Sequence, residues 1–80
     1  MNIEHLVTMA NQIGDFFRSY PDQEQAKQDI ASHLTRFWAP QMRQQILDHI
    51  AQTTDTGLQP LVLNAIREHV RIKNAAQPTL

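Results

Sequence analysis

The side chains best suited to metal binding or acid–base chemistry are four histidines, and they are spread over the whole chain: His5, His33, His49 and His69. Metal sites use histidine, cysteine and carboxylate ligands at short, characteristic spacings, and none of these histidines is paired with another histidine or a carboxylate at a recognised metal spacing. A metal site would need residues from four predicted helices to converge. The spacing therefore favours isolated surface or boundary histidines, and we expect no metal ligand.

Nucleophilic catalysis has equally little support. Neither Ser19 nor Ser32 is followed by a glycine-rich loop that would form an oxyanion hole. Neighbouring carboxylates near predicted helix ends are explained as solvated charges. Gly14 and Gly57 lie too far apart to form a phosphate-binding loop. We expect no catalytic and no cofactor-binding residue, so the chain is not predicted to be an enzyme on its own.

The composition indicates one small domain. Eighty residues, 41% of them hydrophobic, suffice for a thin core, and we expect a domain over residues 1–73 with a flexible tail over 74–80. The absence of cysteine excludes disulfides and thiolate ligands to zinc or iron–sulfur clusters. No apolar run is long enough to cross a membrane, which points to a cytoplasmic protein with no membrane partner. A net charge of −1 argues against nucleic acid as a partner.

Apolar residues recur at intervals of three and four along most of the chain, which is typical of amphipathic helices. We predict helices at residues 3–18, 22–37, 40–52 and 59–72. The connections between them are short and contain proline, glycine or polar residues. No segment alternates as a strand does. The pattern predicts an all-α fold, either a small four-helix bundle or an orthogonal helical array.

Two helices carry more specific expectations. Gly14 lies within the first helix, where glycine is costly, so we expect the backbone of another element to approach it closely. Asp22 is predicted to cap the second helix, with Gln25 reaching back to form a capping box. The apolar face of that helix is predicted to contain Ala26, Ile30, Leu34 and Phe37, with His33 and Trp38 at its flanks.

Two dense patches, residues 9–17 and 36–43, are candidates for a protein-binding surface. Phe16 and Phe17 are adjacent, so they point about 100° apart on a helix and cannot both fill one thin core. Phe37 and Trp38 pose the same problem. One member of each pair could therefore lie at the rim, although periodicity alone favours the interpretation in which both pairs plug the ends of a small bundle. The predicted partner-binding residues are Met9, Asn11, Gln12, Phe16, Phe17, Arg36, Phe37, Trp38, Pro40, Met42 and Arg43.

At these two patches the sequence resembles the delta subunit family of NAD-dependent formate dehydrogenases. These are small accessory chains of cytoplasmic enzymes that contain molybdenum or tungsten. The resemblance is carried by residues 6–14 with Phe16 and Phe17, by residues 33–43 and by residues 57–62. The strings MANQIG and FWxPxMR are specific in combination, and the likeness extends over about residues 3–70.

The resemblance implies a non-catalytic subunit that binds the catalytic alpha subunit and supports assembly, or insertion or retention of the molybdenum cofactor. The complex would carry bis-molybdopterin guanine dinucleotide, iron–sulfur clusters, FMN and NAD, none of them bound by this chain alone. We hypothesise that Phe16, Trp38 and Met42 anchor the chain on the alpha subunit. Hydrogen bonds at the rim would come from Asn11, Gln12, Arg36 and Arg43.

Two alternatives remain open from the sequence. The sharp turn at residues 38–40 between two short helices is compatible with a helix-turn-helix DNA-binding regulator. Its recognition helix, residues 40–52, would hold Arg43 as its only arginine or lysine, so it would make few phosphate contacts. A homo-oligomeric helical scaffold, such as a homodimer of the isolated chain, is the other alternative.

Overall fold

The computed structural model describes residues 2–70, and these residues fold into four α-helices. The helices are α1 (Ile3–Phe17), α2 (Gln23–Phe37), α3 (Pro40–Gln52) and α4 (Pro60–His69). The all-α prediction is confirmed, and seven of the eight predicted boundaries agree within one residue. Helix α4 is shorter than predicted, because Val70 already has an extended backbone and acts as the C-cap. The predicted tail, residues 74–80, lies outside the described residues.

The starts of the helices follow from capping residues and prolines. The Asp22 carboxylate accepts a hydrogen bond from the backbone N–H of Gln25 at 3.3 Å, as predicted for the cap of α2. The reciprocal half of the capping box is replaced, because the Gln25 side chain donates to Asp29 at 2.9 Å. Pro40 and Pro60 are the first residues of α3 and α4, where a missing N–H costs little.

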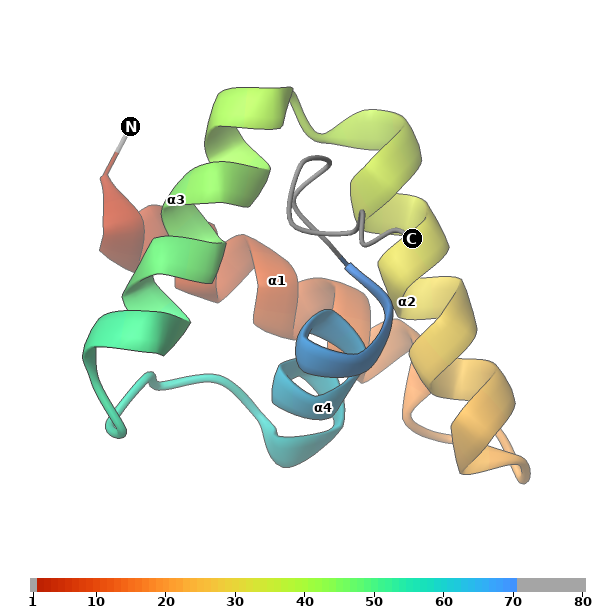
Figure 1. Cartoon of the computed structure of the whole chain (residues 1–80). Helices are drawn as coiled ribbons and strands as arrows, with labels where there is room; N and C mark the ends of the chain where they lie inside the picture. Colours follow the sequence, from red (N-terminus) through yellow and green to blue (C-terminus); the bar gives the residue numbers. More distant parts are fainter. Residues whose placement is uncertain (1, 71–80) are drawn as a thin grey trace, which may run out of the picture.

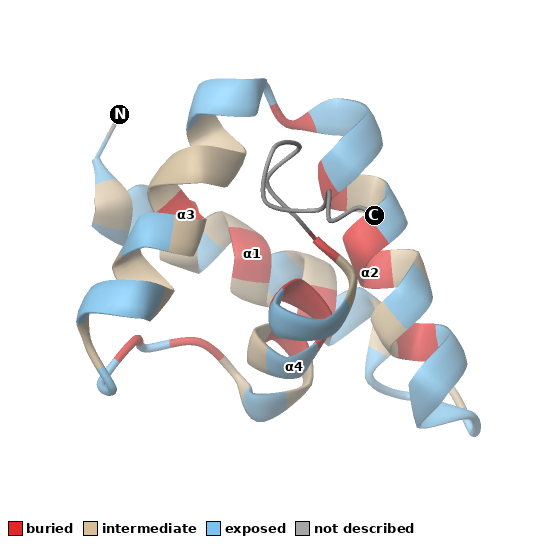
Figure 2. Cartoon of the chain, in the orientation of Figure 1, coloured by how far each residue is buried: buried red, intermediate tan, exposed pale blue. Residues whose placement is uncertain are grey.

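Helix α1 is the central element of the fold (Figure 1). It contacts each of the other three helices, while α2 and α4 pack most extensively against one another. Figure 2 shows that the buried residues of all four helices face the interior. None of the helices in residues 2–70 combines the length and apolar character needed to cross a bilayer. The core consists of Leu6, Ala10, Ile30, Ala31, Leu34, Trp38, Ile46, Leu58, Val62, Ala65, Ile66 and Val70.

The predicted orientation of Phe37 and Trp38 is wrong. Phe37 is 69% exposed and does not belong to the apolar face of α2, whereas Trp38 is buried at 5% exposure. The reason is the end of the helix, since Trp38 is the C-cap and has an extended backbone (φ −88°, ψ 141°). A residue that leaves the helix no longer follows its 100° periodicity, so the indole turns into the core.

Gly14 is buried where α1 meets α4, and the close approach predicted for it is made by a side chain rather than a backbone. A Cβ at this position would collide with Cγ2 of Val62, which is fully buried. The same Cβ would lie 3.0 Å from Oε1 of Gln59. The glycine therefore lets the first turn of α4 pack directly onto α1.

Candidate functional site

A continuous stripe of side chains along α1 lines one wall of an apolar groove, which we call the aromatic groove. The stripe is formed by residues 9, 12, 13, 16 and 17, which follow the i, i+3, i+4, i+7, i+8 spacing of one helix face. Across from it lie His33 of α2 and the buried Trp38 at the end of that helix. The groove has a volume of about 430 Å³. Its lining residues are Met9, Gln12, Ile13, Phe16, Phe17, His33 and Trp38.

Aromatic rings gather at both sides of this groove. Phe16, 74% exposed, packs edge-on against Phe17 with 5.0 Å between ring centroids, and Phe17 packs similarly against Tyr20 at 5.3 Å. On the α2 side, the ring of Phe37 lies 4.7 Å from that of His33. Phe16 and Phe37 are the large hydrophobic residues most exposed in the described chain. One member of each adjacent aromatic pair thus lies at the surface.

The groove is suited to binding apolar side chains. Among residues 2–70, its lining contains no Asp, Glu, Lys or Arg. Exposed phenylalanine and methionine are typical of protein-binding surfaces, where burial of aromatic rings supplies much of the affinity. Gln12 provides an amide that can orient a partner at the edge. The arrangement offers binding chemistry and no nucleophile paired with a base.

Asn11 lies outside the groove and joins distant parts of the chain. Its Nδ2 donates to the carbonyl of Gly57 at 3.0 Å, and its Oδ1 accepts from the backbone N–H of Gln59 at 2.9 Å. The Gln59 side chain returns to α1, where Nε2 donates to the carbonyl of Asn11 at 3.3 Å and to Asp15 at 2.6 Å. Gly57 has a φ of +79°, which glycine adopts without strain. These bonds fix the segment before α4 against α1.

Arg43 also makes contacts within the chain. Its Nη1 donates to the carbonyls of Leu34, Thr35 and Trp38 at 3.4, 3.2 and 2.5 Å. These carbonyls end α2, so the guanidinium satisfies acceptors that a helix C-terminus leaves open and places a positive charge at the negative end of the dipole. Arg43 thereby fixes the α2–α3 corner that holds Trp38.

The remaining predicted residues do not line the groove. Arg36 is exposed and lines a separate hollow with Ser32 and His69. Pro40 is exposed at the start of α3, and Met42 packs half-buried against the core.

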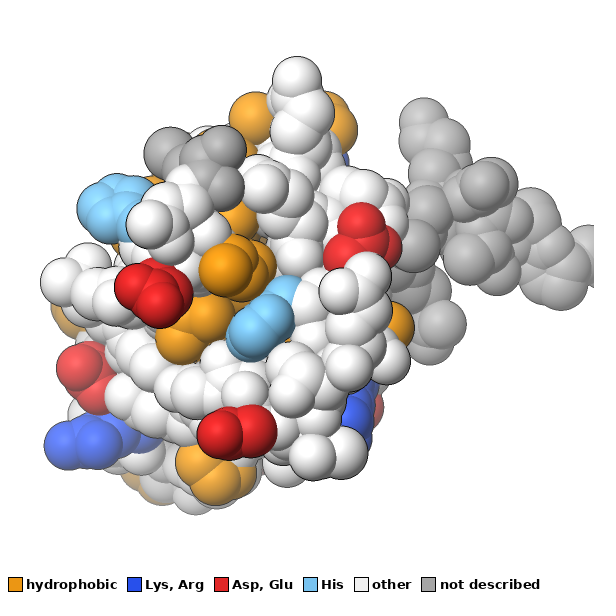
Figure 3. Space-filling view, turned by 90° about the vertical axis from the view of Figure 1, so that its left-hand side faces the viewer, with side chains coloured by type: hydrophobic (Ala, Val, Ile, Leu, Met, Phe, Trp, Pro, Cys, Tyr) orange, Lys and Arg blue, Asp and Glu red, His pale blue; other side chains and the backbone are white. Residues whose placement is uncertain are grey.

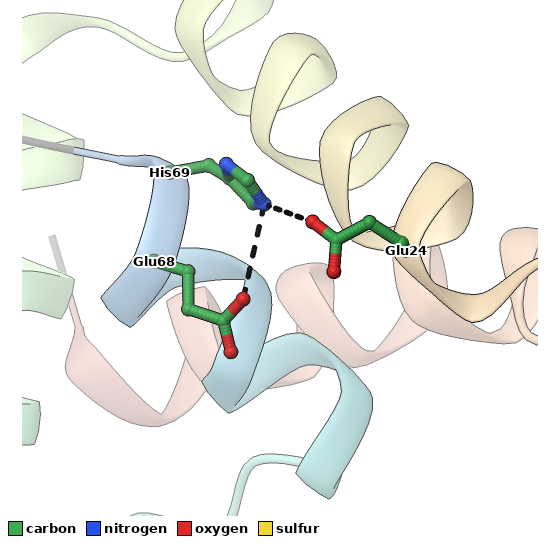
Figure 4. A group of neighbouring side chains, drawn as sticks. All are labelled: Glu24, Glu68 and His69. Atoms are coloured by element: carbon green, nitrogen blue, oxygen red, sulfur yellow. Dashed lines mark hydrogen bonds and ion pairs between the residues drawn. The ribbon is translucent and has the colours of Figure 1, made fainter.

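A second cluster of titratable side chains connects α2 to α4. Figure 4 shows His69 directed at two carboxylates, with Nε2 lying 3.1 Å from Glu24 and 3.9 Å from Glu68. His69 is therefore not isolated, contrary to the expectation from sequence. The ammonium of Lys27 lies 3.1 Å from Glu24 and 2.8 Å from Glu68. A divalent cation would have to displace this ammonium, so we interpret the cluster as an ion-pair network.

The ion pairs perturb the titration of the two groups at the centre of the network. The hydrogen bonds from Lys27 and then His69 hold the pKa of the Glu24 carboxyl below its ordinary value of 4.5. The hydrogen bonds to Glu68 and then Glu24 raise the pKa of Lys27 above 10.5. Each shift means that folding favours the charged form of the group.

Comparison with known protein families matches residues 5–66 to the NADH-dependent formate dehydrogenase delta subunit FdsD. The match covers well over half of the chain. The chain belongs to the FdsD family. Searches of curated proteins and of solved structures gave no match. The resemblance inferred from the sequence strings is thereby confirmed.

The region that matches the FdsD family contains the whole aromatic groove. Residues 5–66 extend from the first turns of α1 into α4, so they also include the Asn11 contacts and the Arg43 cap. The groove brings together five of the eleven residues predicted from the sequence: Met9, Gln12, Phe16, Phe17 and Trp38. The prediction omitted Ile13 and His33. The i, i+4 spacing of His33 and Phe37 was the signal that could have identified the histidine.

Proposed function

We propose that this chain is a non-catalytic delta subunit that binds the catalytic alpha subunit of a formate dehydrogenase through the aromatic groove. Membership of the FdsD family supports the assignment to this enzyme. The observation that carries the choice of surface is the exposure of Phe16 and Phe37 beside an uncharged groove. In this proposal the anchors are the two exposed phenylalanines, while Trp38 forms the floor.

The energetics of such docking are favourable. Burying a phenylalanine side chain contributes about 1.5–3 kcal/mol, so two exposed rings can supply several kcal/mol on association. The T-shaped contacts of Phe16 with Phe17 and of Phe17 with Tyr20 hold the ring of Phe16 in place before binding, and the ring of Phe37 packs against that of His33. A surface ordered in advance loses less side-chain entropy when the partner binds.

In the complex, the chain would support assembly, or insertion or retention of the molybdenum cofactor, in the cytoplasm. The bis-molybdopterin guanine dinucleotide, iron–sulfur clusters, FMN and NAD belong to other subunits in this proposal. The chain offers no cysteine to ligate a cluster, so the side chains present do not fit an iron–sulfur site. Formate oxidation is therefore assigned to the larger chains.

The experiment is a purification of the tagged chain from its native host under mild salt, followed by identification of the proteins that accompany it. We expect the catalytic alpha subunit of formate dehydrogenase. The molybdenum content and activity of the enzyme should fall in a strain that lacks the chain and recover when it is supplied. Recovery of the chain without any formate dehydrogenase subunit would contradict the proposal.

A further inference from the structure

A hollow on a different face of the molecule has an apolar floor and a rim of carboxylates. Two adjoining cavities, of about 430 and 260 Å³, share Ile3 and His49 and lie between the start of α1, the end of α3 and the segment that follows α3. Glu4 and Asp55 line the first cavity and Asp48 lines the second. We call this surface the acidic hollow. Within the part of the chain that the structure describes, its lining contains no lysine or arginine.

Figure 3 views the molecule from this side. Hydrophobic side chains lie at the centre of the face, histidine and carboxylate side chains surround them, and lysine and arginine side chains appear only toward its edges. Ile3 and Val7 are half-buried residues that pack against the core and form the apolar floor. The face is therefore apolar at its centre and negative at its rim.

The three carboxylates of the hollow have no cationic partner within residues 2–70. Glu4, Asp48 and Asp55 are exposed and form no ion pair there. By contrast, Asp15 pairs with Arg18, and Glu24 pairs with Lys27. The positive charges of the described chain thus lie elsewhere, which leaves a net negative field over the hollow.

One wall of the hollow is fixed in place. His49 Nε2 donates to the carbonyl of Thr56 at 2.9 Å, and since a carbonyl only accepts, this nitrogen carries the proton. Thr56 is buried, and its hydroxyl accepts from the backbone N–H of Leu58 at 3.2 Å. The next residue, Gly57, is held by Asn11. The carboxylate of Asp55 is consequently carried by a segment tied to both α1 and α3.

We propose that the acidic hollow binds a segment of a partner protein in which an arginine side chain lies beside an apolar one. The hollow is not shaped for a single metal ion, because the group of metal-ligating atoms found within 4.8 Å of one another in the described chain is Glu24, Glu68 and His69. Separated carboxylates around an apolar floor instead match a guanidinium with several donors on an aliphatic stem. The stem covers Ile3 and Val7 while the charged head reaches the rim.

The identity of the partner rests on the proposed function, under which it is another part of the formate dehydrogenase complex. The expected binding of an arginine side chain to the acidic hollow does not depend on the proposed function. Because the aromatic groove lies between α1 and α2 and the acidic hollow between α1 and α3, the two surfaces can be occupied together. The groove would supply contact insensitive to salt, and the hollow a contact that weakens as salt rises.

The test is an NMR titration of the isotope-labelled full chain with N-acetyl-leucyl-arginine amide. Its control is the same compound with citrulline, which keeps the shape of arginine without the charge. We expect the arginine probe to shift the amide signals of Val7, His49 and Thr56, and to bind at least about 3-fold more tightly than the citrulline probe. Equal binding of the two probes, or no shift at these residues, would overturn the proposal.

Matched variants locate the effect. Asp48→Asn and Asp55→Asn should each reduce the difference between the probes, whereas Asp29→Asn removes the same charge from α2 and should leave the difference intact. The amide oxygen introduced by Asp48→Asn can still accept the 2.8 Å hydrogen bond from Gln44, so the fold is kept. An equal effect of all three variants would point to net charge alone and reject the site. Because the probes need no enzyme, failure to co-purify formate dehydrogenase would refute the proposed function separately.

Discussion

Asn11 and Gln59 exchange two hydrogen bonds although they lie 48 positions apart in the sequence. The backbone N–H of Gln59 donates to the side chain of Asn11, and the side chain of Gln59 donates to the backbone of Asn11. The contact joins the MANQIG string to the stretch that opens α4. Two of the strings that carry the family resemblance are thus in direct contact, and this part of the resemblance reflects how the chain folds.

Replacing Asn11 by alanine should destabilise the fold by about 1–3 kcal/mol. The substitution removes the exposed bond to the carbonyl of Gly57 and leaves the partly buried N–H of Gln59 without its partner. A polar group that loses its hydrogen bond in a partly buried place costs about this much. Urea unfolding followed by circular dichroism measures the change. Gln12→Ala, at the exposed neighbouring position, is the control. Equal stabilities of the two variants would show that the contact is dispensable.

Gly14→Ala should also destabilise the chain, by about 1–3 kcal/mol, even though alanine favours helix. The new methyl group meets Cγ2 of Val62, a short side chain buried in the core that has little room to move. The decisive comparison is made in a Val62→Ala background, where the space is free. There, Gly14→Ala should be neutral or stabilising. A similar loss of stability in both backgrounds would mean that the close packing is not the cause.

Arg43→Lys should lower the stability of the chain by about 0.5–1.5 kcal/mol, despite conserving the charge. A single ammonium does not reproduce the planar guanidinium that reaches three carbonyls at the end of α2. Arg36→Lys is the matched control, because the Arg36 side chain is exposed and makes no hydrogen bond within residues 2–70. If both lysine variants unfold at the same urea concentration as the parent chain, the capping role is refuted.

The Glu24–Lys27 pair should make stability depend on pH in a defined direction. The folded chain holds the pKa of Glu24 below 4.5, so this contribution is complete above pH 4.5 and is lost as pH falls through the lower folded value. The pKa of Lys27 is raised above 10.5, so its contribution is present below 10.5 and is lost as pH rises through the folded value.

Thermal unfolding of the parent chain and of Glu24→Gln, measured from about pH 3 to pH 7, tests the predicted loss of stability in acid. The glutamine variant should have the lower melting temperature near neutral pH, and the difference should shrink in acid. The Glu24→Gln substitution also removes the ion pair with His69, and this loss contributes to the same difference in melting temperature. A difference that stays constant over the whole range would exclude the titration of Glu24 as the cause.

The helices were predictable because their information is local. The spacing of apolar residues located all four helices. The starts of three of them are marked by residue types that favour a helix N-terminus, namely Asp22, Pro40 and Pro60. The direction of the Trp38 side chain was not predictable in this way, since it depends on the extended backbone of the residue that follows the helix. The prediction from helical periodicity therefore assigned Phe37 to the core and Trp38 to the flank, which is the reverse of what the structure shows.

The candidate site was predictable only in part for a related reason. The stripe along α1 is periodic, so Phe16 and its neighbours were found, but the other wall of the groove depends on how α2 packs across α1. Asn11 and Arg43 were predicted to contact a partner because a sequence does not show distant contacts within the chain. Their bonds to Gly57 and to the end of α2 exist only in the folded structure.

The central claim is that the chain binds the catalytic alpha subunit of formate dehydrogenase through the aromatic groove, and the affinity between the two purified chains tests it most directly. We expect Phe16→Ser and Phe37→Ser each to weaken binding by about 10-fold or more while leaving helical content and stability unchanged, because both rings are exposed in the free chain. Leu61→Ser, in α4 and outside the groove lining, is the comparison for loss of a half-buried hydrophobic residue elsewhere. Undiminished affinity in both phenylalanine variants would contradict the account.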